Sequence, residues 1–212
     1  MYLPPAFRED RIDVQHDLIR THPLGLLITA GPGGLMANPV PFLVYAEEGG
    51  RGTLRAHVSR ANPVLQELAA VPECLIVFQG PQHYVTPSWY ATKEESGKVV
   101  PTWNYVTVHA WGAPRVVDDG AWLRRQLEDL TRSQERARPA PWSIDDAPGD
   151  FIAAQMKGIT GVEISITRVE GKWKLSQNRL EADRQGVADG LRTQSESGKA
   201  MADLIAAMTR NG

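Results

Sequence analysis

A short polar segment in the first third of the chain combines side chains that suit phosphate binding. It is Ser59-Arg60-Ala61-Asn62, followed by Pro63. Asn62 and Pro63 predict the cap and the first residue of a helix, whose opening N–H groups have no partner within the helix. The helix dipole, these free donors and the Arg60 guanidinium would all favour an anion. A capping residue beside an exposed arginine is also common in proteins, so the segment alone leaves both interpretations open.

A second stretch, residues 99–112, predicts a β-strand because it is rich in β-branched and aromatic residues. Side chains alternate across a strand, so one face carries Thr102 and Asn104 and then small apolar residues suited to a barrel interior. The other face begins with Trp103 and carries large rings. Such a face favours a flat ligand or a partner subunit, but a buried aromatic cluster would give the same pattern.

Other kinds of chemistry find little support in the sequence. His57, His83 and His109 lie on different predicted elements, without a His-Glu-x-x-His sequence or nearby carboxylates at ligand spacing, so we expect no metal site. No serine lies in a Gly-x-Ser-x-Gly elbow, and no Rossmann fingerprint is present. The catalytic residues therefore stay unidentified at this stage.

The composition is that of an ordinary globular chain of 212 residues, 42% hydrophobic and 23% charged. A formal net charge of −2 and the lack of a basic recognition helix argue against direct nucleic-acid binding. The single cysteine, Cys74, excludes an internal disulfide and is expected to be buried and inert. We see no signal peptide and no apolar run long enough to span a membrane, so we expect a cytoplasmic protein.

The elements that position these side chains are mostly short strands joined by turns, which predicts a mainly β, α+β chain with an antiparallel barrel and peripheral helices. The prolines of Asn38-Pro39-Val40-Pro41 should place their strand at a sheet edge or a bulge. A turn is predicted at Glu170-Gly171, and His16 is expected at the surface. We predict six or seven strands, over 24–30, 35–46, 53–58, 73–80, 99–117, 161–169 and 172–178. Helices are predicted over 11–21, from 63, and over 121–136, 150–157, 180–191 and 197–208, with a loop or short helix at 91–98.

Five segments of the chain, taken in order, resemble the PaiB family. They are residues 1–4, 57–63, 87–90, 100–105 with 108–109, and 172–178. The resemblance extends from residue 1 to about residue 191. Members of this family are described as FMN-binding negative transcriptional regulators with the split-barrel fold of pyridoxamine-phosphate-oxidase-like flavoproteins. The implied organisation is an FMN-binding split β-barrel over 1–178 and a C-terminal helical extension over 179–212, packed on the barrel or on a dimer mate.

The resemblance implies a homodimer with FMN near the subunit interface, held by residues of both chains. Ser59, Arg60 and Asn62 match the place where split-barrel flavoproteins hold the FMN phosphate, and His57 would lie along the ribityl chain or the ring edge. The strand that contains Asn38 and Pro41 would meet the pyrimidine edge of the flavin through its backbone.

A second wall of the implied site comes from Thr102, Trp103 and Asn104, in one chain or its partner. Lys174 and Gln177 would close the site. Lys174 is the candidate cation near flavin N1 and the C2 carbonyl, where a positive charge favours the reduced anion.

Three functions fit the resemblance. The first is an FMN-dependent oxidoreductase that acts on a small molecule or a nicotinamide donor, NAD(P)H. The second is a negative transcriptional regulator without enzymatic turnover, which would act through a protein or metabolite because direct DNA contact is doubtful. The third is a haem-binding split-barrel relative, with His83 or His109 as an axial ligand.

Overall fold

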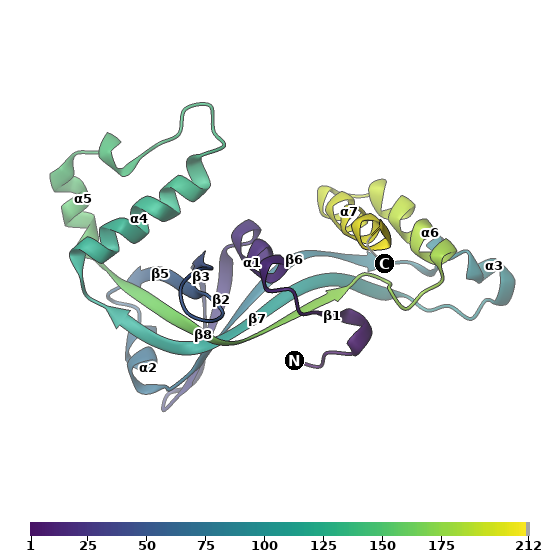
Figure 1. The fold of residues 1–212 in the computed structure, drawn as a ribbon, viewed down its shortest axis with the longest axis horizontal. Helices are drawn as coiled ribbons and strands as arrows, with labels where there is room; N and C mark the ends of the chain where they lie inside the picture. Colours follow the sequence, from purple (N-terminus) through teal and green to yellow (C-terminus); the bar gives the residue numbers. More distant parts are fainter. Residues whose placement is uncertain (211–212) are drawn as a thin grey trace. The chain divides into compact units, whose positions relative to one another are not determined.

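The computed structural model describes residues 1–210, which fall into two compact units interleaved along the chain (Figure 1). The first unit contains residues 1–11, 79–108 and the chain from Glu170 onward, and the second contains 12–78 and 109–169. Three long strands run from one unit into the other: β6 (Cys74–Val85), β7 (Thr102–Val117) and β8 (Ile159–Lys174).

Eight strands form one antiparallel sheet in the order β3-β2-β6-β7-β8-β5-β4, and β1 pairs with β8. This confirms the predicted antiparallel sheet with peripheral helices. The sequence missed the shortest strand, β1, because two residues carry no detectable period. The remaining strands are β1 (Arg8–Glu9), β2 (Leu24–Gly31), β3 (Gly34–Pro41), β4 (Leu43–Tyr45) and β5 (Thr53–Ser59).

The β2–β3 hairpin of the second unit pairs from Leu24 opposite Pro41 to Gly31 opposite Gly34. Gly34 completes the turn with a φ of +96°, a backbone conformation that favours glycine. β3 lies at one end of the sheet order, as its prolines predict, and the strand predicted over 35–46 divides after Pro41 into β3 and β4.

The core of the second unit lies between the inward faces of its strands and its helices. Cys74 is buried as expected, and burial raises the pKa of its thiol to about 12, so the thiol stays protonated and inert. The helical segments of this unit are α1 (Ile12–Thr21), α2 (Val64–Ala70), α4 (Gly120–Glu135), η3 (Ile144–Asp146) and α5 (Gly149–Met156). Its fully buried side chains include Leu27, Phe42, Leu54, Ala56, Val64, Ile76, Phe78, Ala110 and Ile164.

In the first unit, α6 approaches Trp89 closely at two glycines. A Cβ on Gly190 would lie 2.4 Å from the indole ring, and one on Gly186 would lie 2.1 Å from the Trp89 carbonyl oxygen. Only glycine fits at such distances. The helical segments here are η1 (Pro5–Phe7), η2 (Pro87–Trp89), α3 (Thr92–Ser96), α6 (Glu181–Arg192) and α7 (Glu196–Arg210).

Three local predictions were wrong. No turn forms at Glu170-Gly171, because β8 continues through both residues while β1 pairs alongside it. The strand predicted to end at residue 80 instead continues as β6 to Val85. His16 is buried, not exposed, because α1 packs beside β4 and places the His16 Nε2 3.0 Å from the Arg51 carbonyl oxygen.

Candidate functional site

Two groups of predicted site residues can be followed in the structure, one in each unit. The first, which we call the corner, lies where β5 ends and α2 begins, beside β3. Asn62 Nδ2 donates to Asn38 Oδ1 at 3.3 Å, and Asn62 Oδ1 accepts from Val64 N at 3.0 Å. The Asn38 Nδ2 is buried and has no hydrogen-bond partner within residues 1–208. A buried amide donor without a partner is costly, so an acceptor group of a bound ligand would fit here.

The α2 helix itself contributes less to the corner than the sequence suggests. It begins at Val64, one residue later than predicted, and has only seven residues. Its first free N–H is already satisfied by the Asn62 side chain, and Ser59 Oγ accepts from Ala61 N at 3.2 Å. The fit to a phosphate therefore rests on side chains, not on a helix dipole.

Arg60 is the corner residue that differs most from the expectation. Its guanidinium pairs with Asp118, and its Nε donates to the Lys157 carbonyl oxygen at 3.0 Å. The hydrogen bond from Arg60 lowers the pKa of Asp118. Arg60 lines a pocket of about 330 Å³ between α4 and α5, so a phosphate at the corner would have to compete with Asp118 for it.

His57 and Pro41 complete the predicted set in this unit. The His57 Nδ1 lies 2.9 Å from Gln126 Oε1 on α4, so α4 engages the face of β5 that carries His57. Gln126 is 1% exposed, and its Nε2 has no partner in the part of the chain that the structure describes. Pro41 lies exposed at the end of β3, opposite Leu24.

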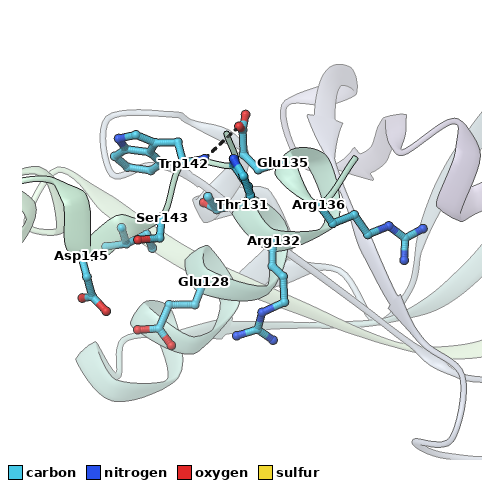
Figure 2. A pocket seen from close by; sticks show the side chains of 10 residues that line it. Glu128, Thr131, Arg132, Glu135, Arg136, Trp142, Ser143 and Asp145 are labelled. Atoms are coloured by element: carbon cyan, nitrogen blue, oxygen red, sulfur yellow. Dashed lines mark hydrogen bonds between the residues drawn. The ribbon is translucent and has the colours of Figure 1, made fainter. Parts of the chain in front are cut away.

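A larger pocket, of about 510 Å³, lies along the C-terminal half of α4 and the connector that follows it (Figure 2). Figure 2 shows charged side chains around it and the Trp142 indole at its rim. Its carboxylates are largely paired: Glu128 and Asp145 with Arg124, and Glu135 with Arg138. Sequence patterns do not reveal this pocket, because its walls come from a helix and a connector that returns beside it.

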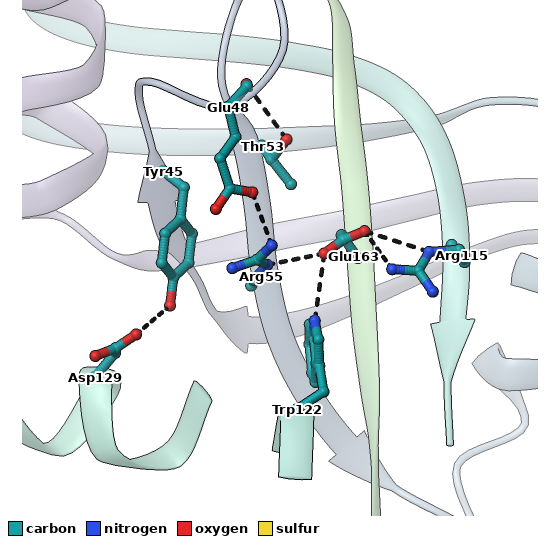
Figure 3. A network of polar contacts seen from close by, with 8 residues as sticks. All are labelled: Tyr45, Glu48, Thr53, Arg55, Arg115, Trp122, Asp129 and Glu163. Atoms are coloured by element: carbon teal, nitrogen blue, oxygen red, sulfur yellow. Dashed lines mark hydrogen bonds and ion pairs between the residues drawn. The ribbon is translucent and has the colours of Figure 1, made fainter. Parts of the chain in front are cut away.

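Beneath α4, a charge network covers the outer face of β5 and β8 (Figure 3). Arg55 pairs with Glu48 at 2.7 Å and with Glu163 at 2.8 Å, and Arg115 reaches Glu163 at 2.6 Å. Trp122 Nε1 also donates to Glu163, at 3.4 Å. Burial alone would raise the pKa of Glu163, but hydrogen bonds from Arg115 and Arg55 outweigh it and the pKa is lowered.

Tyr45 extends this network toward α4. The Arg55 guanidinium lies over its ring, 4.3 Å from the centroid, and its hydroxyl donates to Asp129 at 2.8 Å. Burial, reinforced by Asp129, raises the pKa of Tyr45 to about 12. Sequence patterns did not reveal this network, because two residues in direct contact, Arg55 and Glu163, lie 108 positions apart in the chain.

The second group of site residues, which we call the turn, follows β8 in the first unit. Ser176 has a φ of +66°, in the left-handed region, and Arg179 N donates to Ser176 O at 3.0 Å. Gln177 Oε1 accepts from Leu175 N at 2.7 Å, and its amide also donates to the Trp173 carbonyl oxygen. Gln177 thus uses its side chain to fix the turn.

Asn104 stabilises the same turn from β7. It is 0% exposed, and its Nδ2 donates to Ser176 Oγ at 3.0 Å. This buried hydrogen bond ties the turn to β7.

Lys174 carries the positive charge of the turn and contacts the two remaining predicted residues, Thr102 and Trp103. Its Nζ donates to Thr102 Oγ1 at 2.6 Å and to the Trp103 carbonyl oxygen. Burial lowers the pKa of Lys174, and the positive charges of Lys172 and Arg179 lower it further. Trp103 is 53% exposed.

Within each unit, then, the structure brings together Asn38 with Asn62, and Lys174 with Thr102 and Trp103. Over residues 1–210, no group of three or more histidine, cysteine or acidic side chains is arranged to hold a metal ion. No helix in that range has the length and apolar character needed to cross a membrane.

Solved structures share this architecture with the chain. They include the FAD and heme binding protein of Mycobacterium smegmatis, with a TM-score of 0.57 and 19% identity over 79% of this chain and 73% of that one. The flavocytochrome Anf3 of Azotobacter vinelandii gives a TM-score of 0.56 and 15% identity over 79% and 69%. At such identities the likeness shows a shared fold, which places the chain in the split-barrel class.

The family is shown by sequence. The family model described as "Putative FMN-binding domain" matches residues 1–168, and the chain belongs to this family of FMN-binding domains. An uncharacterized protein of Emericella nidulans is 34% identical over 97% of this chain and 96% of that protein. The protease synthase and sporulation protein PAI 2 of Bacillus subtilis is 28% identical over 97% and 96%. The predicted resemblance to the PaiB family is thereby confirmed.

Proposed function

We propose that this protein binds FMN as a homodimer and is an oxidoreductase for a small molecule, with NAD(P)H as a candidate electron donor. The observation that carries the FMN assignment in this structure is the unpartnered Asn38 Nδ2 at the corner. It is a buried donor that lacks an acceptor, in a chain whose family is defined by FMN binding. Bound FMN would supply the electron transfer, and the protein would position it.

In this proposal the corner binds the phosphate end of FMN, whose oxygens accept hydrogen bonds. Asn38 and Asn62 offer amide groups, Ser59 offers a hydroxyl, and Arg60 offers a guanidinium once it exchanges Asp118 for phosphate. Pro41 and His57 lie on the neighbouring strands β3 and β5.

In this proposal the turn offers further groups for ligand binding. Lys174 and Thr102 offer polar groups, and Trp103 offers an exposed ring. Gln177 and Asn104 keep the turn in shape, because their side chains are already engaged within it.

The homodimer is supported by the outer face of the β2–β3 hairpin. Residues that share this face are all apolar, and several are well exposed: Leu24 is 64% and Leu35 is 84% exposed. An exposed sheet face without a polar side chain is typical of a surface that another subunit covers. The face contains Leu24, Leu26, Ile28, Ala30, Leu35, Ala37, Pro39 and Pro41.

The decisive experiment is an absorbance spectrum of the pure protein, with and without added FMN and NADPH. We expect FMN to bind at one equivalent per chain, and we expect NADPH to bleach the flavin absorbance. Protein that takes up no FMN on titration would refute the proposal. A strong band in the haem Soret region of the untreated protein would instead favour the haem-binding alternative.

Regulation is the second candidate function, because the PaiB family is described as one of negative transcriptional regulators. We expect an indirect route, since the chain carries a net charge of −2 and much of the arginine charge in the second unit is paired with carboxylates. Salt-resistant, sequence-selective DNA binding in a gel-shift assay would contradict the indirect route.

A further inference from the structure

Three cations of the first unit stand close together without an acidic partner. Lys172, Lys174 and Arg179 have no carboxylate within ion-pairing distance among residues 1–208. Lys172 is only 8% exposed, and its Nζ donates to the Tyr2 carbonyl oxygen at 3.0 Å. Grouping partly buried like charges costs free energy, and proteins retain such groups mainly where a function requires them.

The turn after β8 brings two of these cations together. Lys174 ends the strand, and the hydrogen bond from Arg179 N to Ser176 O folds the chain back over four residues. The two charges are near enough that Arg179 contributes to the lowered pKa of Lys174. Gln177 and Asn104 fix this geometry through their contacts with the turn, so the pair is preorganised.

Both cations retain unused hydrogen-bond donors. An ammonium group has three N–H donors, and Lys174 uses two of them, toward Thr102 and the Trp103 carbonyl. The Arg179 guanidinium lies over the Tyr90 ring, 4.7 Å from its centroid. It donates to no carboxylate or carbonyl within the described part of the unit. A guanidinium fork held against an aromatic face is well suited to a planar oxyanion.

An exposed aromatic pair adjoins Lys174. Trp103, whose carbonyl accepts from Lys174, is 53% exposed, and Tyr84 is 43% exposed. Their ring centroids lie 6.1 Å apart in an edge-to-face arrangement. Exposed rings next to unpaired cations suit a ligand that combines a flat ring with a negative charge.

We propose that Lys174 and Arg179 bind the carboxylate or phosphate group of a ring-bearing substrate, whose ring contacts Trp103. The identification of this ligand as a substrate of the flavin rests on the proposed function; the anion site itself does not. Two sources could supply the anion, a second small molecule or the phosphate of FMN, and the test separates them.

The test is calorimetric titration of the full-length protein, without and with saturating FMN, using benzoate and phenyl phosphate as probes. Benzamide serves as the neutral probe of the same shape. We expect the anions to bind at least tenfold more tightly than benzamide, with an affinity that falls as salt rises. Arg179→Gln and Lys174→Gln should each weaken anion binding about tenfold, a loss typical of one charge-assisted hydrogen bond.

Lys98→Gln is the matched control, because Lys98 is an exposed lysine of the same unit outside the turn, and it should leave anion binding unchanged. Far-ultraviolet circular dichroism verifies that each variant is folded. A loss of FMN affinity in Arg179→Gln, with anion binding retained, would assign the cations to the FMN phosphate and overturn the proposal. Loss of the dimer with unchanged anion binding would overturn it too, since the cations would then pair with a partner chain.

The outcomes also separate this inference from the proposed function. Protein that binds the anions through Arg179 but takes up no FMN supports the anion site and refutes the flavoprotein. Protein that binds FMN but does not discriminate benzoate from benzamide supports the flavoprotein and refutes the anion site.

Discussion

The two units differ in whether their clustered charged side chains form ion pairs. In the second unit, Arg55 and Arg115 converge on Glu163, and a tryptophan N–H completes the set (Figure 3). In the first unit, Lys172, Lys174 and Arg179 gather at the end of β8, and none of them forms an ion pair with a carboxylate among the described residues. In the first arrangement the charges are paired without a ligand. In the second, the cations are unpaired, and Lys174 and Arg179 retain unused N–H donors.

This difference separates residues that serve the fold from residues that can serve a ligand. A paired, partly buried carboxylate is expensive to remove because its cations lose their partner. An unpaired lysine repels its neighbours, so its removal should cost little stability but should cost binding. The contrast can be tested by matched substitutions in the two units.

The largest effect is expected from Glu163→Ala. Glu163 is 14% exposed and binds two arginines, so its loss should lower the free energy of unfolding by about 2–4 kcal/mol. Urea unfolding of the variant and the parent measures this. Glu48→Ala removes a more exposed partner of Arg55, 42% exposed, and should cost at most about 1 kcal/mol. Equal losses in the two variants would show that the network is not centred on Glu163.

The same carboxylate makes stability depend on pH. The pKa of Glu163 is lower in the folded chain than its ordinary value of 4.5, because the hydrogen bonds from Arg115 and Arg55 outweigh burial. Its contribution is therefore fully present above about pH 4.5 and is lost as the pH falls through the lowered folded value. Unfolding measured between neutral and acidic pH should show a shallower decline in Glu163→Gln than in the parent. A parallel decline in both would contradict the assignment.

A smaller effect on stability is expected in the first unit. Lys174→Met removes a charge near Lys172 and Arg179 but also two hydrogen bonds. These changes oppose one another, so the free energy of unfolding should stay within about 1 kcal/mol of the parent. A loss comparable to that of Glu163→Ala, measured by the same urea titration, would make Lys174 a structural residue and remove the contrast.

The smallest effect concerns the corner. Asp118→Asn should free Arg60 from its ion pair and strengthen FMN binding, on the order of twofold, because an exposed ion pair is weak. Fluorescence titration with FMN measures the change, with Asp145→Asn as an exposed acidic control in the same unit. Weaker FMN binding in Asp118→Asn would indicate that the ion pair holds Arg60 in its productive place.

The sequence predicted most of the architecture because local patterns report local structure. The alternating strands over 24–30 and 35–46 and the helix over 121–136 all depend on patterns of residues close together in the chain. The same patterns failed at Glu170-Gly171, where a turn-like dipeptide is held straight by pairing with β1. They also failed at His16, which α1 buries beside β4.

The same contrast between local patterns and long-range contacts applies to the candidate site. The residue types follow from the sequence: a hydroxyl, a guanidinium and an amide at 59–62, rings at 103–111 and cations at 172–179. Which of these groups are free depends on the fold, since ion pairs and hydrogen bonds join residues far apart in the chain. Asp118 engages Arg60 across 58 residues, and Ser176 engages Asn104 across 72. Lys174 and Arg179 keep their spare donors because no acidic side chain of the described chain reaches them.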